Sequence, residues 1–418
     1  MSNRRRAIVA FALLSLAAAV PARADDAVME WNQIALAATA TAGQGANPQT
    51  RSMAIVQVSV HDAVNAITCE YRTYLRIGCG PWYGSPEAAA IAAAHYALVS
   101  LFPSQAGPLN TARATSLSSR GLSDTDPGVA LGQAVAAAIV ALRGSDGAAQ
   151  AQFPYTAPGA GAPGVWVPLS ATPALLPGWG SVTPWALRSG SQFRPVAPPS
   201  LKSVRYARDY NEVREVGSLT SSVRTAEQTE ISRFWLATPS AIWNGVARQI
   251  IAAKNLDLSS AARTLALVYM ATSDAGIACW DAKYAYNFWR PTTAIRQGDL
   301  DDNARTAPDP TWAPLFNVPQ HPEYVSGHST NSSAMAWILI LLYGDEPGVA
   351  MTVTSPTNPN LQRQWTKITE GISEVIDARI FGGFHFRTSN ETGARLGERI
   401  ARFVLKHELE PREDRHKK

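Results

Sequence analysis

Apolar residues recur at intervals of three and four along most of the chain, as they do on the buried face of a helix. Helices are predicted in the N-terminal third at 28–40, 52–67, 86–102, 107–119 and 127–143. The pattern resumes at 204–217, 224–236, 239–254, 258–289, 328–343, 361–379 and 389–407. No segment shows a convincing period-two alternation, so we predict an all-α fold made of helical bundles.

Residues 145–203 break the helical pattern. They are dense in Gly and Pro, show no sustained period, and include Trp166, Trp179 and Trp185. A connection of this length is either a linker or a functional covering segment, and the tryptophans favour a packed cover. The predicted division is an N-terminal helical part, a covering segment, a C-terminal helical part and a charged, frayed tail: 25–144, 145–203, 204–408 and 409–418.

The first residues have the pattern of an export signal. A basic stretch at 4–6, an apolar stretch at 7–20 and a small-residue cleavage site at 22–24 follow one another. The apolar stretch is short for a membrane span, so a membrane anchor is the less favoured alternative. We therefore predict a signal peptide at 1–24 and a periplasmic or extracellular location. Its removal lowers the formal net charge from +4 to 0, and nothing suggests nucleic-acid binding.

The chain has three cysteines, Cys69, Cys79 and Cys279, and no pair of them has zinc-ligand spacing. In an oxidising compartment Cys69 and Cys79 would close a short disulfide loop. Cys279 would then be a small buried residue in a helix.

Two pairs of polar residues fall inside predicted helices. His61 and Asp62 lie in a predicted core helix, where structural hydrogen bonding is the favoured role. Asp274 and Asp281 are seven residues apart and share one face of a helix. For these two we expect polar contacts to a neighbouring helix.

The first of three segments with candidate chemistry runs from Lys283 to Pro291. Lys283 and Arg290 are seven residues apart, so a continuous helix would place them on one face. Pro291 biases Arg290 out of helical conformation, which would put its guanidinium at the helix end. Two cations among aromatic residues are costly to desolvate without an anion, but solvated surface charges are the commoner fate. From this segment alone the two interpretations are equally favoured.

The second segment is Ser326-Gly327-His328, at the start of a predicted helix. The Ser hydroxyl, free backbone N–H groups and the helix dipole would all favour an anion at this point. His328 can donate or accept a proton near neutral pH. Taken alone, an ordinary Ser N-cap is the favoured interpretation.

The third segment contains Arg379 and His385 on either side of a turn at Gly382-Gly383. The sequence Thr388-Ser-Asn-Glu391 has the pattern of a capping box that opens the next helix. Arg379 and His385 could therefore point into one cavity, although a surface turn is the favoured interpretation of this segment by itself.

Together the three segments supply three cations, a hydroxyl, a backbone donor and two histidines, a set that suits a tetrahedral or trigonal-bipyramidal oxyanion. The spacings K-x6-R-P, S-G-H and R-x5-H resemble those of the type 2 phosphatidic acid phosphatase and vanadium haloperoxidase superfamily. The resemblance to the bacterial haloperoxidase branch extends more loosely over most of the mature chain. The positions that match are Lys283, Arg290, Ser326, Gly327, His328, Arg379 and His385.

The resemblance implies a vanadate cofactor and a role for each motif residue. Lys283, Arg290 and Arg379 would hold the equatorial oxygens, together with Ser326 and the N–H of Gly327. His385 would be the axial ligand to vanadium, or the nucleophile toward phosphorus in a phosphatase. His328 would be the acid–base residue. Hydrogen peroxide and a halide would be the substrates, with or without a small organic substrate.

Three positions depart from the family pattern: Ala378 stands where Ser is usual, Val325 where Pro is usual, and Ser389 where Asp is usual. A carboxylate at the last position would orient the imidazole of His385 and stabilise its charge. A hydroxyl does so more weakly, so this departure predicts a weaker axial bond and a lower vanadate affinity.

Two further residues are candidates for the surroundings of the halide. His321 precedes Ser326 by five residues, where bromoperoxidases of the family have His and fungal chloroperoxidases have Phe. The resemblance thus favours bromide, and a turn histidine satisfied by local hydrogen bonds is an equally weighted alternative. Trp289, beside Arg290, is the second candidate.

The sequence favours one function and leaves two alternatives. The long chain and the aromatic residues around the motifs favour vanadium-dependent halide peroxidation to hypohalous acid. An exported acid phosphatase with a phosphohistidine intermediate is the second interpretation, because the same cage can stabilise a phosphoryl transition state. A non-catalytic oxyanion-binding protein is the third. The oligomeric state is not predicted.

Overall fold

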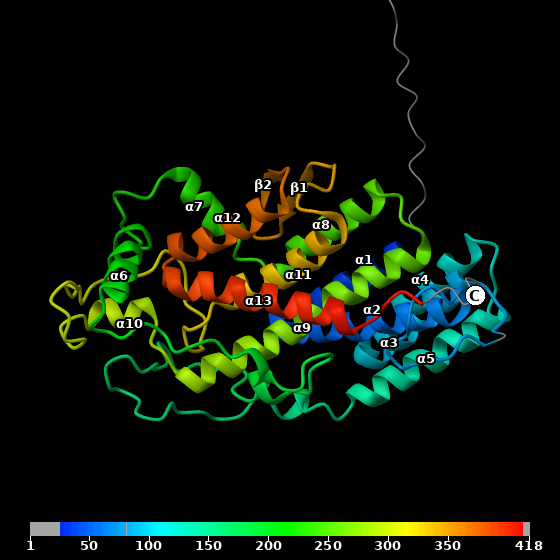
Figure 1. Cartoon of the computed structure of the whole chain (residues 1–418), viewed down its shortest axis with the longest axis horizontal. Coiled ribbons are helices and arrows are strands. Elements are labelled where there is room, and N and C mark those ends of the chain that lie inside the picture. The colour runs from blue at the N-terminus through cyan, green and yellow to red at the C-terminus, as the bar shows by residue number, and fades with distance from the viewer. Residues whose placement is uncertain (1–25, 81, 413–418) are drawn as a thin grey trace, which may run out of the picture.

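The computed structural model describes residues 26–80 and 82–412, so the predicted signal peptide at 1–24 lies outside the described residues. The described chain is mostly helical, which confirms the all-α class (Figure 1). In chain order the α-helices are α1 (Ala27–Thr41), α2 (Ala46–Thr68), α3 (Pro86–Leu101), α4 (Ala106–Ser118), α5 (Pro127–Arg143), α6 (Val204–Val216), α7 (Ala226–Phe234), α8 (Pro239–Ala253), α9 (Leu258–Tyr286), α10 (Pro291–Arg296), α11 (Gly327–Tyr343), α12 (Ile368–Phe381) and α13 (Arg387–His407). Across these ranges no helix combines the length and the apolar character needed to cross a membrane.

The long helix α9 is the central element and packs against α2, α11 and α13. Most of its side chains are buried, and many of them are small. Two glycines let α13 approach α11 closely. A Cβ at Gly393 would lie 2.8 Å from the carbonyl oxygen of Ser326, and one at Gly397 would lie 2.3 Å from that of Thr330. A larger side chain at either position would separate the two helices, so these glycines bring the start of α11 against α13.

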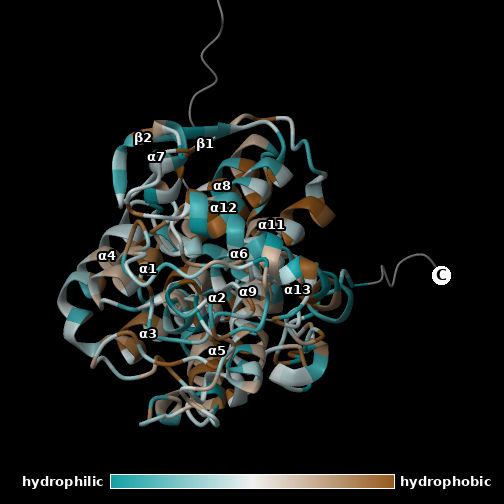
Figure 2. Ribbon diagram, turned by 90° about the vertical axis from the view of Figure 1, so that its left-hand side faces the viewer, coloured by the Kyte–Doolittle hydropathy of each residue, from teal (hydrophilic) through white to brown (hydrophobic). Residues whose placement is uncertain are grey.

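The structure contains a β-hairpin that the periodicity did not predict. Strands β1 (Met351–Ser355) and β2 (Asn358–Trp365) pair antiparallel, with Met351 opposite Trp365, at the edge of the molecule beside α7 and α12 (Figures 1 and 2). The predicted helix at 361–379 was therefore wrong over its first residues, because α12 begins only at Ile368. Strand β1 alternates between more and less buried positions over only five residues, too short a run to identify by pattern.

The covering segment 145–203 lies along α9 and is held there by two aspartates of that helix. Asp274 accepts the backbone N–H groups of three consecutive residues, 185–187, at 2.6, 2.9 and 3.0 Å. Asp281 pairs with Arg194, whose Nε lies 2.7 Å from Oδ2. The expected partner, a neighbouring helix, was thus wrong, since both carboxylates bind the covering segment. Trp166, Trp179 and Trp185 are buried, as a packed cover requires.

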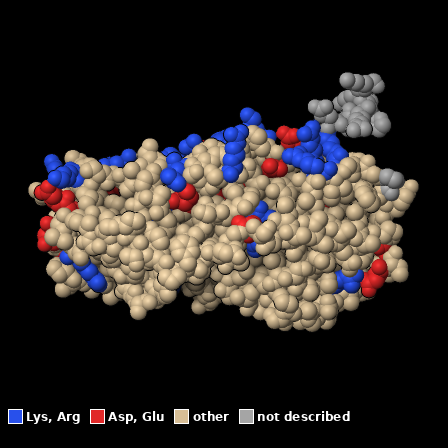
Figure 3. Space-filling model, turned by 90° about the horizontal axis from the view of Figure 1, so that it is seen from below, with Lys and Arg blue, Asp and Glu red and all other residues tan. Residues whose placement is uncertain are grey.

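The side of the molecule that carries the covering segment is nearly free of charge. Seen from below, its surface shows few charged side chains, and most of these lie near the edges (Figure 3). Between residues 144 and 187 the only charged residue is Asp146, which is buried and paired with Arg51 and Arg143. A segment without charge can lie flat on apolar helices without leaving an unpaired charge at the contact.

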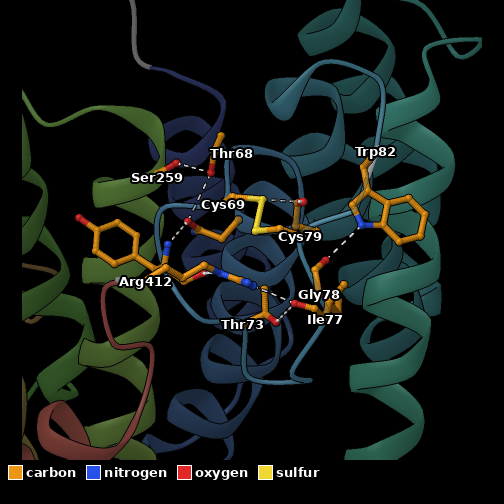
Figure 4. The surroundings of a disulfide bond; sticks show 12 residues. Thr68, Cys69, Thr73, Ile77, Gly78, Cys79, Trp82, Ser259 and Arg412 are labelled. Atoms are coloured by element: carbon orange, nitrogen blue, oxygen red, sulfur yellow. Dashed lines mark hydrogen bonds between the residues drawn. A yellow bond between two sulfur atoms is a disulfide. The ribbon is translucent and has the colours of Figure 1, made fainter. Parts of the chain in front are cut away.

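The predicted disulfide between Cys69 and Cys79 is present, and Cys279 is buried and free in α9, as predicted (Figure 4). The C-terminal tail docks on this disulfide loop. Arg412 donates to the carbonyl oxygens of Tyr71 and Ile77 at 3.0 and 2.8 Å. The prediction of a frayed tail was therefore wrong as far as residue 412, while 413–418 lie outside the described residues.

His61 and Asp62 are fully buried in α2 and make structural contacts, as expected. Asp62 accepts the backbone N–H groups of Tyr74 and Leu75 at 2.7 and 2.8 Å, which holds the disulfide loop against the helix. His61 Nε2 lies 3.2 Å from the carbonyl oxygen of Arg72. Burial lowers the pKa of His61 to about 3 and raises that of Asp62 to about 7.

The start of α13 differs from the predicted capping box at Thr388. The helix begins at Arg387, and its N-cap residue, Phe386, has no capping side chain. Carboxylates from other elements accept the free N–H groups instead: Asp209 of α6 binds the N–H of Thr388 at 3.0 Å, and Glu323 binds that of Phe386 at 3.0 Å. Tertiary contacts thus cap this helix in place of local sequence.

Candidate active site

Lys283 lies in the last turn of α9, and its side chain is fully buried. Its Nζ donates to the carbonyl oxygens of Pro322 and Glu323, both at 2.9 Å. Burial lowers the pKa of Lys283 to about 7, with the charge of Arg290 acting in the same direction. An ammonium has three N–H donors, so one remains for a bound anion.

Arg290 is brought to Lys283 by a turn and not by a continuous helix face. Helix α9 ends at Tyr286, and Asn287 follows in the left-handed conformation with φ 47°. Arg290 itself is extended, with φ −78° and ψ 155°, directly before Pro291 at the start of α10, as predicted from the proline. The expectation of a shared helix face was therefore wrong, although both residues reach the same buried region.

The guanidinium of Arg290 is fully buried and links two loops of the site. Nε donates to the carbonyl oxygen of His321 and Nη1 to that of Phe384, both at 2.9 Å. Nη1 also lies 3.2 Å from Nε2 of His385. Burial lowers the pKa of Arg290 to about 10, so this cation is not the solvated surface charge of the alternative interpretation.

Arg379 lies in the last turn of α12 and is 2% exposed. Its Nη1 donates to the carbonyl oxygen of Trp235 at 2.8 Å, and the guanidinium stacks 4.1 Å from the ring centre of Phe384. Within the described chain, its buried Nε has no hydrogen-bond partner. Burial lowers the pKa of Arg379 to about 9, and the nearby Arg290 adds to this effect.

Ser326 and Gly327 open α11, as predicted. Ser326 is the N-cap residue, and its Oγ accepts from Oγ of Ser329 at 3.3 Å. Gly327 faces the indole of Trp280, where a Cβ would lie 3.3 Å from Cζ3. The N-terminus of α11 therefore offers a hydroxyl and free N–H groups at a point that a side chain at 327 would crowd.

His328 follows in the first turn of α11 and is half-buried. Its Nε2 lies 3.1 Å from the carbonyl oxygen of Ala237, which can only accept, so Nε2 carries the proton and Nδ1 is the basic nitrogen. Burial lowers the pKa of His328 well below its ordinary value, with Arg379 contributing. The imidazole is therefore neutral at physiological pH.

His385 is the residue around which the loops meet, and it is 3% exposed. Its Nδ1 lies 2.8 Å from Oε1 of Glu323. Burial lowers the pKa of His385 well below its ordinary value, and the charges of Arg290 and Lys283 add to this. Glu323 was not among the predicted site residues, although its place three residues before Ser326 could have identified it as a candidate.

Ser389 does not contact His385 in the way an Asp at this position would. Its Oγ lies 3.4 Å from the backbone carbonyl oxygen of Glu323, and its own carbonyl accepts the N–H of Ser326 at 3.2 Å. The imidazole of His385 nevertheless has a carboxylate partner, because Glu323 supplies one from the loop before α11. Burial raises the pKa of this carboxyl to about 7, while Lys283 and Arg290 act against that shift.

Of the two candidates near the halide, His321 contacts the site through Arg290. Its Nδ1 lies 2.9 Å from Nη2 of Arg290, and its ring packs against Trp280 with centroids 4.9 Å apart. Trp289 is fully buried, and its backbone N–H donates to Gly164 of the covering segment at 3.0 Å. Among the described residues, its indole forms no hydrogen bond with the seven motif residues.

The site carries an excess of buried positive charge. Three buried cations, Lys283, Arg290 and Arg379, lie near one carboxyl group, Glu323, and three neutral imidazoles. The lowered pKa of each cation reflects the free-energy cost of burying its charge, and a bound anion would offset that cost. The unpartnered Nε of Arg379, the third N–H of Lys283 and the donors of α11 therefore fit an oxyanion.

The C-terminal part of the chain is similar in sequence to a known domain family and to a known enzyme. Residues 263–413 match the VCPO second helical-bundle domain. A vanadium chloroperoxidase of Curvularia inaequalis is 29% identical over 185 residues, and this match spans 36% of the chain but only 30% of that enzyme's length.

Solved structures extend the similarity of the fold to most of the chain. A bacterial vanadium-dependent iodoperoxidase superposes with a TM-score of 0.76 at 24% identity, over 93% of this chain and 96% of that one. A bacterial vanadium-dependent chloroperoxidase superposes with a TM-score of 0.68 at 18% identity, over 87% and 91%. Residues 263–413 thus match the VCPO second helical-bundle domain, and the described chain has the same fold as these two bacterial vanadium-dependent peroxidases.

Proposed function

We propose that the protein is a vanadium-dependent haloperoxidase that oxidises a halide with hydrogen peroxide to hypohalous acid. The observation that carries this proposal is the excess of buried positive charge beside His385, whose Nε2 is unprotonated and faces Nη1 of Arg290. Lys283, Arg290 and Arg379 would hold the oxygens of vanadate, and the N-terminus of α11 would donate to them. The chloroperoxidase and iodoperoxidase relatives support this chemistry.

The neutral histidines determine how the chain takes part in the reaction. His385 keeps its proton on Nδ1, facing Glu323, so Nε2 has a lone pair with which it would hold vanadium. His328 has a free Nδ1 that would accept a proton from hydrogen peroxide and later return one to a leaving oxygen. Bound vanadate would supply Lewis acidity that activates peroxide toward attack by the halide.

Bromide is the halide that we propose as preferred over chloride. The support is His321, which places an imidazole, polar and bonded to Arg290, where fungal chloroperoxidases have an apolar Phe. Bromide is also easier to oxidise than chloride, so a moderately activated site would act on it first.

We also propose that the protein is exported to the periplasm or the extracellular space. The support is the Cys69–Cys79 disulfide, because structural disulfides are typical of oxidising compartments.

A paired assay on the vanadate-free mature protein tests the proposed activity. One arm measures bromination of a dimedone reporter with bromide and peroxide, and the other measures hydrolysis of a chromogenic phosphate ester, each with and without orthovanadate. We expect bromination that depends on vanadate and is lost in His385→Ala. The matched control is His407→Ala, an exposed histidine near the end of α13, which should behave like the wild type.

The same assay distinguishes the two alternatives. Ester hydrolysis that vanadate inhibits, with no bromination, would identify a phosphatase that uses His385 as nucleophile. Tight vanadate binding without turnover in either arm would identify a non-catalytic oxyanion-binding protein. Either result would contradict the proposed peroxidase activity.

A further inference from the structure

Glu323 occupies an unusual position behind the candidate axial histidine. Its side chain is fully buried, and Oε1 accepts two hydrogen bonds, from Nδ1 of His385 at 2.8 Å and from the N–H of Phe386 at 3.0 Å. Its backbone is fixed as well, because its carbonyl oxygen accepts from Lys283 Nζ at 2.9 Å. The carboxylate is therefore held in one place by groups from α9 and from the loop before α13.

The hydrogen bonds determine which nitrogen of His385 carries the proton. The guanidinium of Arg290 can only donate, so its contact makes Nε2 of His385 an acceptor and places the N–H at Nδ1, opposite Oε1 of Glu323. Nε2 then carries a lone pair, 3.2 Å from Nη1 of Arg290. Without an acceptor at Nδ1, the opposite tautomer, with the proton on Nε2, would become accessible and would have no lone pair for a metal.

Ser389 does not provide that acceptor. Its hydroxyl lies beside the backbone carbonyl of Glu323 at 3.4 Å, a weak contact that does not involve the imidazole. The loop before α11 and the first turns of α13 nevertheless lie against each other, since Ser326 N–H donates to Ser389 O at 3.2 Å. A carboxylate could therefore reach His385 either from the loop before α11, as Glu323 does, or from position 389 in α13.

We propose that Glu323 is the positioning residue of His385 and that it replaces a carboxylate on α13 at the position of Ser389. It holds the Nδ1–H tautomer and the ring orientation, so that Nε2 faces the cations. This proposal rests on the proposed vanadate site, but its tests measure binding and tautomer in the absence of turnover. A failure of haloperoxidase activity therefore leaves them interpretable.

The first test compares two oxyanions on the vanadate-free protein and on Glu323→Gln, which keeps the shape but removes the charge. Orthovanadate can bond to Nε2, whereas sulfate binds through charge and hydrogen bonds alone. We expect the Kd for vanadate to rise about 10- to 100-fold, as loss of a partner behind a metal-binding histidine typically does. Sulfate should bind equally well or more tightly, because a negative charge has been removed from among the cations.

The opposite changes for the two anions separate positioning from structural damage. A variant that has merely lost its packing would bind both anions more weakly. The matched control is Glu374→Gln, a largely buried carboxylate that accepts from Trp235 Nε1 at 2.9 Å and is ion-paired with Arg363. It should leave both affinities unchanged. Unchanged vanadate affinity in Glu323→Gln would overturn the proposal.

The second test observes the tautomer directly in the wild-type protein, without any change at Glu323. Nitrogen-15 NMR of the wild-type imidazoles, with His385 assigned by its loss in His385→Ala, should show a protonated Nδ1 and an unprotonated Nε2. A protonated Nε2 in the wild type would overturn the proposal.

The third test moves the carboxylate to α13. Adding Ser389→Asp to Glu323→Gln should recover most of the lost vanadate affinity, because the introduced carboxylate would accept from the same Nδ1–H across the contact with α11. A double variant that binds vanadate no better than Glu323→Gln would show that the two positions are not equivalent. It would overturn the proposal that Glu323 replaces a carboxylate at position 389.

Discussion

Nη2 of Arg290 lies 2.9 Å from Nδ1 of His321, so one of the three cations of the site is bonded directly to the histidine that the sequence links to halide preference. The same guanidinium also donates to the carbonyl oxygen of His321. Burial lowers the pKa of this imidazole well below its ordinary value, with Lys283 and Arg290 contributing, and its Nδ1 also lies 3.1 Å from the carbonyl oxygen of Pro322. Any change at His321 therefore acts on Arg290 as well as on the space around it.

Replacing His321 with Phe should change the ratio of bromide to chloride oxidation. Phe offers no nitrogen to Arg290 and leaves an apolar ring against Trp280. The Nη2 donor of Arg290 would then be available to the oxyanion. We expect the kcat/KM for bromide relative to chloride to fall, measured by competition between the two halides with vanadate saturating. An unchanged ratio would identify His321 as a turn histidine.

Replacing His328 with Ala should reduce kcat by about 100-fold or more, as is typical when a general acid–base residue is lost. Vanadate affinity should change much less, because His328 holds none of the oxygens in the proposed arrangement. Steady-state bromination kinetics and a separate vanadate titration measure the two effects. If the titration and kcat were both unaffected, His328 would be a helix-capping residue.

The contribution of His61 to the stability of the fold should fall on acidification between about pH 6.5 and 3, whereas the raised pKa of Asp62 acts in the opposite direction. The native pKa of His61, about 3, lies below the unfolded value, so the unfolded state binds the extra proton throughout this window. The effect over the whole window is on the order of 4 kcal/mol. Urea unfolding at pH 7 and pH 4.5 should show a smaller loss for His61→Gln, which cannot titrate. Equal losses in both proteins would exclude this cause.

Replacing Asp274 with Asn should loosen the covering segment. The carboxylate accepts three backbone N–H groups at 185–187, and an amide has one acceptor oxygen for them. We expect a loss of about 1–3 kcal/mol in the free energy of unfolding and faster hydrogen exchange at those amides. The matched control Asp281→Asn breaks the more exposed Arg194 pair and should cost less than about 1 kcal/mol. Similar effects in both variants would contradict an anchoring role of Asp274.

Removing the disulfide should lower stability without changing the site. The Cys69→Ser/Cys79→Ser variant opens a loop with a sequence separation of 10, which corresponds to about 2–3 kcal/mol. Wild-type protein under reducing conditions should unfold like this variant, and the variant should not respond to reductant. Vanadate affinity serves as the control, since the loop docks on the tail and not on the motifs.

The helices and the chemistry could be predicted from the sequence because both depend on local patterns. Apolar periodicity predicted the ends of α1 and α5 to within one residue, and Pro291 correctly predicted an extended Arg290. Lys283, Arg290, Arg379 and His385 could be named because the spacing of their motifs resembles that of a known superfamily, and all four are buried.

What the sequence could not determine are the contacts made across the fold. Asp274 binds the covering segment, and Asp209 caps α13 from α6, because each carboxylate satisfies N–H groups that are remote in sequence. The hairpin β1–β2 forms because its strands pair with each other and pack against neighbouring helices. The stabilisation from these contacts cannot be predicted from the periodicity of apolar residues.

His385 shows most clearly the difference between what the sequence determines and what the tertiary structure determines. The sequence by itself determined that His385 would stand beside cations and that the usual Asp four residues later is Ser389. Only the tertiary structure decided that its imidazole has a carboxylate partner, Glu323, 62 residues away in the chain. The physical reason is that a buried N–H requires an acceptor within about 3 Å, and the folded chain can supply it from any segment that packs there.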